Sequence, residues 1–248
     1  MKVVVIGGTG LIGSKLVAKL REHGHEAVPA APNTGVNTLT GEGLAEVLDG
    51  AAVVVDVSNS PSFADDAVME FFRTATTNLL DHSGKAGVGH YVALSVVGTQ
   101  RLAESGYFRA KIVQESLIRE SGRPYSIVHA TQFFEFGKAI ADFSTVEGVV
   151  RLPSALFQPM AAEDVASAAW GRVAAGEPLN GIREVGGPER LRIDEFVRRV
   201  LAAKGDPREV VTDEDATYYG VVLNDRTLVP GPDAQLGRTT FDKWLTEQ

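Results

Sequence analysis

The 248-residue sequence contains no cysteine. Disulfide bonds, thiolate metal sites and thiol nucleophiles are therefore excluded together, and this absence is compatible with a reducing cytoplasm. Long apolar segments are also missing, because no run approaches the ~20 residues that span a bilayer. The N-terminal run MKVVVIGG breaks at glycine before it reaches the length of a secretory signal. We therefore expect a cytoplasmic protein with no membrane partner.

Positive charge is scarce in this chain. The sequence has 24 lysines and arginines against 32 aspartates and glutamates, a net charge of −8, and no Lys/Arg-rich run. Such a chain repels the phosphate backbone of nucleic acids, so a nucleic-acid partner is not expected. The 5 histidines show no metal-ligand spacing such as HExxH, and we expect no metal site.

Apolar, β-branched runs alternate with segments of helical periodicity over the first half of the chain. Buried strands are predicted at 3–6, 26–31, 51–57, 90–97 and 125–130. Helices are predicted between them at 12–20, 43–48, 66–84 and 107–120. Strands that alternate with helices form right-handed crossovers and a parallel sheet. We therefore predict an α/β fold with a doubly wound parallel sheet over residues 1–132.

This rhythm loosens beyond that point, where we predict a smaller C-terminal substrate lobe, residues 133–248. Two helices are expected there, at 164–173 and 194–203, each with the aspartate at its start as the N-cap. The run IREVGG at 182–187 is a candidate strand that returns to the main sheet.

A glycine-rich turn links the first predicted strand to the first helix in VVVIGGTGLIGSKLV. Glycines at positions 7, 10 and 13 let a pyrophosphate approach the backbone N–H groups and the positive end of the helix dipole. The alternative is a turn whose glycines only tighten the packing of strand and helix. The position of the turn at the start of a βαβ unit favours a dinucleotide site. Expected contacts come from Gly7, Thr9, Gly10, Leu11, Ile12 and Gly13.

The end of the second strand indicates which dinucleotide binds. An acidic residue there would hold the ribose diol of NAD and repel the 2′-phosphate of NADP. No carboxylate lies between Ala27 and Gly41, and no arginine that would clamp the phosphate lies there either. Asn33 and Thr34 could donate hydrogen bonds to that phosphate. The absence of repulsion favours NADP over NAD as the cofactor.

The stretch LSVVGTQRLAESGYFRAK, residues 94–111, holds the residues expected to carry the chemistry. Ser95 ends a predicted strand, at the edge of the sheet where doubly wound folds bind ligands. Tyr107 and Lys111 lie one helical turn apart on one face, at the start of the next helix. The alternative is a tyrosine at the edge of a loop, beside a solvated lysine.

These segments resemble the short-chain dehydrogenase/reductase superfamily, whose glycine motif, serine strand and Tyr/Lys pair match GGTGLIG, LSVVG and Tyr107-x-x-x-Lys111. YSIVHATQFFEF, MAAEDVASA and VGGPERLRIDEFV are similar to motifs of its atypical NmrA-like branch, also labelled NAD-dependent epimerase/dehydratase-like. The resemblance implies a Rossmann-type fold and hydride transfer. Tyr107 would exchange the proton, with its pKa lowered by Lys111 and the oxidised nicotinamide, and Ser95 would hold the substrate oxygen.

Further contacts follow from the same resemblance and from the ends of the predicted strands. Cofactor contacts are expected from Ser58, Asn59, Lys111, Ala130 and Thr131. Substrate contacts are expected from Val96, His129, Phe133 and Phe134, and the tail residues Tyr218 and Tyr219 are candidates for a lid. The alternatives are an Asn-Ser-Pro turn for the first pair and core packing for the phenylalanines. Phe72 departs from the superfamily's pattern, because an asparagine often completes a proton relay at that position. Asn78 matches a different position, with a structural role.

The sequence thus favours an NAD(P)-dependent oxidoreductase that acts on a small carbonyl or alcohol. NmrA-like proteins also include sensors that bind the dinucleotide without turnover. The intact Tyr/Lys pair argues for the enzyme, and the missing asparagine argues for the sensor. A nucleotide-sugar epimerase or dehydratase would use the same pair but usually carries a longer C-terminal lobe. A homodimer through the helices that flank the Ser95 strand is compatible with the sequence.

Overall fold

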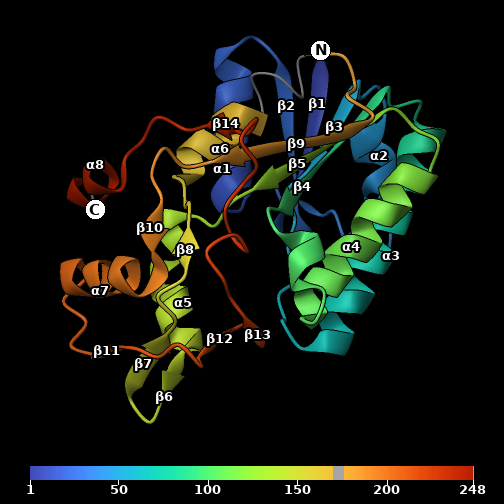
Figure 1. Cartoon of the computed structure of the whole chain (residues 1–248). Coiled ribbons are helices and arrows are strands. Elements are labelled where there is room, and N and C mark those ends of the chain that lie inside the picture. The colour runs from blue at the N-terminus through green and yellow to red at the C-terminus, as the bar shows by residue number, and fades with distance from the viewer. Residues whose placement is uncertain (170–175, 248) are drawn as a thin grey trace.

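The computed structural model describes residues 1–169 and 176–247. Its centre is a seven-stranded sheet in which every neighbouring pair of strands is parallel (Figure 1). The strands lie in the order β2 (Glu26–Ala30), β1 (Lys2–Ile6), β3 (Val53–Asp56), β4 (His90–Val96), β5 (Tyr125–Ala130), β9 (Gly181–Gly186) and β14 (Gln235–Leu236). The predicted parallel α/β sheet is confirmed, and the first five strands lie where the apolar runs placed them.

Helices cover both faces of this sheet, as the alternation of side chains in β1 requires. Val3 and Val5 face α1 (Leu11–Glu22) and α6 (Ala162–Ala169). Val4 and Ile6 face the opposite layer, which consists of α2 (Leu44–Leu48), α3 (Asp65–Lys85) and α4 (Gly106–Glu120). A strand that buries both faces must be apolar throughout, which is why β1 reads as an uninterrupted apolar run.

The strand order predicts where along the sheet a ligand would bind. β2 lies on one side of β1 and β3 lies on the other, so the chain reverses its direction of winding between them. Parallel sheets bind ligands in the crevice that opens at such a reversal, outside the carboxyl ends of the strands. The loops after β1 and β3 are therefore the first place to look for a site.

The chain beyond β5 contributes to two separate cores. One part returns to the main sheet as α6, β9 and β14. The other part packs around Phe134, Phe157, Phe196 and Phe241 and lies at the lower left of Figure 1. Its helices are α5 (Gly137–Phe143), α7 (Ile193–Ala203) and α8 (Phe241–Thr246). Its strands are β6 (Thr145–Val146), β7 (Val149–Leu152), β8 (Leu156–Phe157), β10 (Leu191–Arg192), β11 (Val210–Thr212), β12 (Thr217–Tyr218) and β13 (Val221–Val222).

Several features of this second half differ from the expectations. β9 is the expected return strand and pairs with β5, but β14 was not foreseen because it is only 2 residues long. Asp164 does not cap α6, which begins at Ala162; its Oδ2 instead accepts hydrogen bonds from the backbone of the 238–239 segment. Asp194 lies inside α7 and accepts a bond from Thr212 at 2.6 Å. The expected end of the first of these helices, residue 173, falls outside the described residues.

Across residues 1–169 and 176–247, the helices are too short or too polar to cross a lipid bilayer.

Candidate functional site

A cleft of about 830 Å³ opens at the carboxyl ends of β1, β3, β4 and β5. It is lined by the loops after these strands, by the start of α4 and by the β12–β13 segment. This is the edge at which the strand order predicts a ligand, and the volume lies in the range of small-molecule and cofactor sites.

The glycine loop at one end of the cleft is shaped by close backbone approaches. Gly7 has a φ of +76°, which favours glycine. A Cβ on Gly13 would lie 2.1 Å from the carbonyl oxygen of Gly7, and one on Gly8 would lie 2.6 Å from the Cα of Pro29. These three glycines therefore fold the loop. Gly10 differs, because the nearest atom to a Cβ there would be 3.3 Å away.

The start of α1 can hold an anion. Gly10 is the N-cap of this 12-residue helix, and no side chain caps it. The first N–H groups of the helix are therefore free of a capping side chain, and the helix dipole adds positive potential at the same place. Thr9, Gly10, Leu11 and Ile12 all line the cleft here, whereas Gly13 packs beneath them. The loop fits a dinucleotide diphosphate.

The two residues expected at the 2′-phosphate, Asn33 and Thr34, are exposed in the turn after β2. Asn33 and Thr34 lie in the 3₁₀ turn η1 (Pro32–Thr34) and do not line the cleft. The Thr34 hydroxyl accepts the N–H of Ala31 at 2.9 Å, and the Asn33 amide oxygen accepts the Thr9 hydroxyl at 3.1 Å. Thr34 therefore closes the turn, and Asn33 links the turn to Thr9 of the glycine loop.

The cleft wall after β2 is instead mostly apolar, formed by Ala31, Pro32, Val36 and Leu39. Asn78 on α3 donates to the carbonyls of Thr38 and Leu39 and so holds this wall in place, which is a structural role. Among the described residues that line the whole cleft, Lys111 carries the single ionisable group of the Asp, Glu, Lys, Arg and His types.

Tyr107 reaches the cleft from the first turn of α4. This helix begins at Gly106, where a Cβ would lie 2.0 Å from the carboxylate of Asp65, so glycine lets α4 start against α3. The Tyr107 hydroxyl donates to the Asn59 amide oxygen at 3.3 Å. Burial raises the pKa of the Tyr107 phenol, and the neighbouring Tyr219 adds to the rise. In the structure the phenol is therefore protonated at neutral pH, whereas the resemblance led us to expect a lowered pKa.

Lys111 lies one turn further along α4 and is buried. Its Nζ donates to the Leu94 carbonyl at 2.9 Å and to the Gln114 amide oxygen. The ammonium also lies 4.3 Å from the ring centroid of Phe72, so the ring stands beside Lys111 at the position of the expected asparagine. Burial lowers the pKa of Lys111 from 10.5 to about 8, against the opposing charges of Asp56 and Glu115.

Gln114 extends this arrangement to a buried carboxylate that the sequence reading missed. Its Nε2 donates to Asp56 Oδ2 at 3.2 Å, and the Tyr91 hydroxyl reaches the same oxygen at 3.3 Å. Ser58 donates its hydroxyl to Asp56 Oδ1 at 2.6 Å. The signal was present in VVVDV, where one acidic residue ends an otherwise apolar strand.

Ser95 lines the cleft, and its hydroxyl already has a buried partner. Its hydroxyl donates to Glu115 Oε1 at 2.6 Å, inside the protein, and His129 Nε2 lies 2.8 Å from the same oxygen. Burial raises the pKa of Glu115, but the bonds from His129 and Ser95 and the charge of Lys111 outweigh it, so the pKa is lowered. Val96, the next residue of β4, lines the cleft as well. The His129 side chain pairs with Glu115 and does not line the cleft.

The segment after β5 divides between the cleft and the second core. Ala130, Thr131 and Phe133 line the cleft as expected. Phe134 does not, because it is buried in the second core, 5.3 Å from the ring centroid of Phe241. Gln132, which the sequence did not single out, also lines the cleft.

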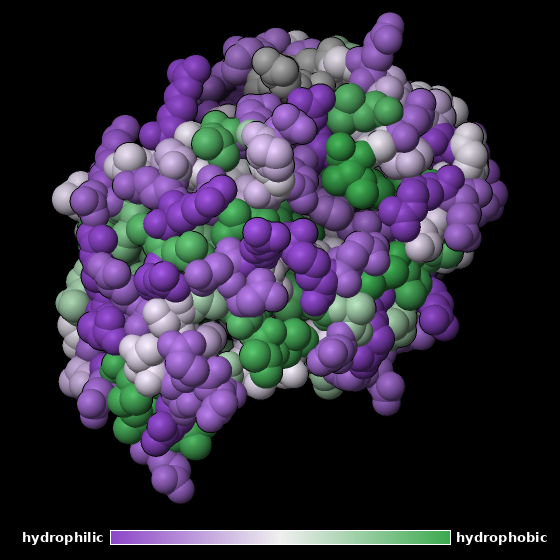
Figure 2. Space-filling view, viewed as in Figure 1, coloured by the Kyte–Doolittle hydropathy of each residue, from purple (hydrophilic) through white to green (hydrophobic). Residues whose placement is uncertain are grey.

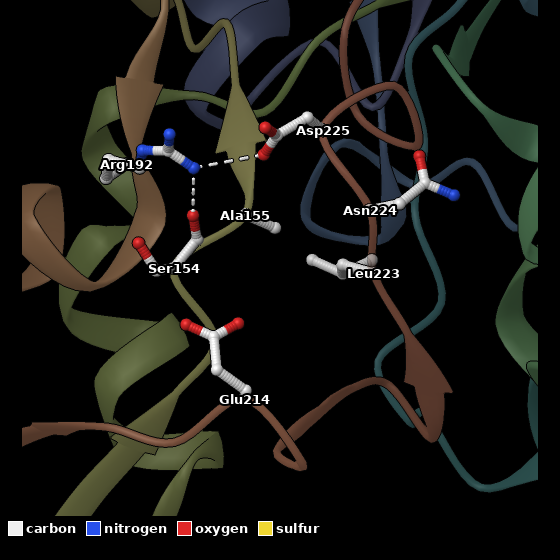
Figure 3. Close-up of a pocket in the computed structure, with 7 residues that line it drawn as sticks. All are labelled: Ser154, Ala155, Arg192, Glu214, Leu223, Asn224 and Asp225. Carbon is white, nitrogen blue, oxygen red and sulfur yellow. Dashed lines mark hydrogen bonds and ion pairs between the residues drawn. The ribbon is translucent and has the colours of Figure 1, made fainter.

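A second, smaller cavity of about 410 Å³ lies on the C-terminal part (Figure 3). Arg192 reaches across it and donates to the Ser154 carbonyl at 2.5 Å and to Asp225 at 3.1 Å. Glu214 also lines this cavity. None of the residues predicted for the site lines it.

Comparisons with known proteins agree with this description at the level of the fold. No family model matches the chain. The photosystem II assembly factor Ycf39 of Cyanophora paradoxa is 24% identical over 149 residues, which is 54% of this chain and 46% of that protein. The chain thus spans about half the length of this relative.

Solved structures match over the full length. MoeE5 in complex with UDP-glucose and NAD superposes with a TM-score of 0.76 at 18% identity and covers 100% of this chain and 97% of its own. A short-chain dehydrogenase/reductase superfamily protein from Agrobacterium tumefaciens with bound NAD gives 0.70 at 16%, with 100% and 95% covered. At such identities the likeness establishes the architecture: the chain has the Rossmann-type fold of NAD-binding short-chain dehydrogenase/reductase proteins.

Proposed function

We propose that this protein is an NAD(P)-dependent oxidoreductase that exchanges a hydride with a small carbonyl or alcohol. The observation that carries the proposal is the pairing of two features in one cleft. An uncapped helix start behind Gly10 lies at one end, and the hydroxyl of Tyr107, one turn from the buried cation of Lys111, lies at the other. The first feature suits a diphosphate and the second suits proton transfer.

The cofactor contacts follow from the residues along the cleft. The N–H groups at the start of α1 would hold the diphosphate, and the apolar wall after β2 would cover the adenine. Ser58, Asn59, Ala130 and Thr131 line the stretch between this end and Tyr107. The wall after β2 offers neither a carboxylate nor a guanidinium among its described lining residues. We therefore propose a modest preference for NADPH over NADH, with dissociation constants within about tenfold of each other.

The nicotinamide, when bound, supplies the hydride in reduction and accepts it in oxidation. Tyr107 provides the proton. Because burial raises the pKa of its phenol, the hydroxyl keeps its proton across the neutral range and is a donor. The alkoxide-like oxygen of a reduced carbonyl is more basic than a phenolate, so the transfer still runs downhill. Asn59 orients the hydroxyl, and the charge of Lys111 stabilises the phenolate that remains.

A second candidate is a dinucleotide-binding sensor without turnover. It is favoured by the surroundings of Lys111, whose ammonium already has two carbonyl partners and the face of Phe72. Such a protein would need the cofactor contacts but no proton donor.

Replacement of Tyr107 by phenylalanine tests the proposal. NADPH and NADH oxidation are followed with a panel of neutral carbonyls, beside Tyr125→Phe as a matched control at the start of β5. We expect Tyr107→Phe to lower kcat on the order of 10²–10⁴-fold, with an unchanged dissociation constant for the cofactor. Turnover that survives in this variant would overturn the assignment. Tight cofactor binding with no turnover across the panel would favour the sensor.

A further inference from the structure

We infer that the substrate is an uncharged, mostly apolar carbonyl compound and not a nucleotide sugar. The inference rests on the proposed function, because it concerns the space that Tyr107 opens onto. We call this space the substrate chamber. It is the part of the cleft lined by Phe63, Phe133, Phe136, Ile140, Tyr218 and Tyr219.

The walls of the chamber are aromatic and continuous with Tyr107. The ring centroid of Tyr107 lies 5.4 Å from that of Phe63 and 6.2 Å from that of Tyr219. Tyr219 continues the wall outward, because its ring stacks on Phe143 at 4.7 Å. A molecule that reaches the catalytic hydroxyl therefore passes along ring faces. Such walls favour apolar or aromatic molecules over hydrated ones.

The charge of the cleft excludes a second diphosphate. A nucleotide sugar brings two phosphate charges, which lose hydration in a closed site unless cations or many N–H groups replace the water. Lys111 is the single charged residue among the described lining residues, and it lies beside Tyr107 with its own carbonyl partners. In the proposed complex, the diphosphate of the cofactor binds the free N–H groups at the start of α1. The chamber therefore has no group left for another anion.

Two buried polar atoms lie beside the chamber. The Thr131 hydroxyl oxygen and the Gln132 amide oxygen have no hydrogen-bond partner among the described residues. The two residues are 1% and 7% exposed, and both line the cleft where it leaves β5. The Gln132 amide oxygen is a hydrogen-bond acceptor, so it would repel a phosphate.

The rim of the chamber is apolar as well. Phe63 and Phe136 line the cleft and are 43% and 42% exposed, and Phe143 is 59% exposed. On the face shown in Figure 2, apolar side chains gather in small patches that polar side chains separate. Exposed aromatic rings at the edge of a cavity are typical of sites that admit apolar ligands.

Calorimetric titration of the chain tests the inference. The probes are three neutral ketones (2-acetonaphthone, 4-phenyl-2-butanone and acetophenone) and UDP-glucose, each with and without saturating NADPH. We expect at least one ketone to bind about tenfold or more tightly than UDP-glucose. Phe136→Arg, which brings a cation into the chamber, is expected to weaken ketone binding. Val146→Arg adds the same charge at an exposed position outside the cleft lining and should change nothing.

The outcomes separate this inference from the proposed function. UDP-glucose that binds as tightly as every ketone, or ketone binding that Phe136→Arg leaves unchanged, would overturn the inference while cofactor binding stands. Ketone binding by a chain that takes neither NADPH nor NADH would support the chamber and overturn the oxidoreductase.

Discussion

The two halves of the cleft are built in different ways. The glycine half is one stretch of backbone, residues 7–13, whose shape depends on approaches closer than any Cβ allows. The tyrosine half is assembled from side chains on several separate segments, and Lys111 and Ser95 are held there by the buried side chains of Gln114 and Glu115. Added atoms should therefore damage the first half, whereas lost hydrogen bonds and charges should damage the second.

The largest expected effect is in the glycine half. In Gly13→Ala the new Cβ would lie 2.1 Å from the Gly7 carbonyl oxygen, so the loop must move. We expect the free energy of unfolding to fall by about 3 kcal/mol and cofactor binding to be lost. Urea unfolding and calorimetry measure the two effects.

Gly10→Ala is the matched control for this substitution. Its Cβ would lie 3.3 Å from the same oxygen, and Gly10 has an extended backbone with a φ of −82°. Stability should change by about 1 kcal/mol or less. Equal destabilisation by Gly13→Ala and Gly10→Ala would contradict the claim that close backbone approaches shape the glycine loop.

Lys111, in the tyrosine half, is expected to make the free energy of unfolding depend on pH. Its pKa is lowered from 10.5 to about 8 in the folded chain. Between these two values the unfolded state binds more protons, so the free energy of unfolding rises with pH at this site, by roughly 3 kcal/mol in total. The stability of the wild type minus that of Lys111→Met should therefore increase from pH 8 to pH 10.5. Lys85→Met, which removes an exposed lysine paired with Asp81, is the control for the loss of a surface lysine.

Ser95→Ala separates a structural role from a catalytic one. The variant removes the bond from Ser95 to Glu115, and loss of a charge-assisted hydrogen bond of this kind costs about 2 kcal/mol of stability. We expect kcat/KM of the variant, measured below its unfolding temperature, to stay close to that of the wild type. A large loss of turnover at unchanged stability would show that Ser95 contacts the substrate oxygen.

The smallest effect is expected at Thr34, in the turn after β2. Thr34→Val removes the bond to the Ala31 N–H and should lower the free energy of unfolding by about 1 kcal/mol. The ratio of the NADPH and NADH dissociation constants should stay the same. A shift of this ratio toward NADH would show that the hydroxyl contacts the 2′-phosphate.

The sequence could predict what is local and repetitive. β1 to β5 were predictable because a strand buried on both faces must be apolar, and the glycine spacing marked the turn after β1. β14 was not, because 2 residues carry no pattern. The starts of α6 and α7 were displaced because their aspartates bond to distant segments rather than to the helix start.

The direction of single side chains was the part that the sequence could not predict. Ser95 and Val96 both line the cleft, but the sequence did not show that the Ser95 hydroxyl is bonded to Glu115. Phe133 and Phe134 are neighbours too, but Phe133 lines the cleft and Phe134 packs in the second core. A shift of one residue in a strand exchanges the two faces, and only the packed structure decides it.

Dinucleotide binding at the start of α1 is tested most directly by calorimetric titration of NADPH into the wild type and into Gly10→Glu. A Cβ at Gly10 would meet the Gly7 carbonyl oxygen at 3.3 Å on an extended backbone, a contact that a small shift relieves, so we expect the variant to fold. Its carboxylate would occupy the start of α1, where the diphosphate is proposed to bind. We expect one saturable NADPH site per chain in the wild type and none in Gly10→Glu. A folded wild type that binds no dinucleotide, or a variant that binds it equally well, would contradict this expectation.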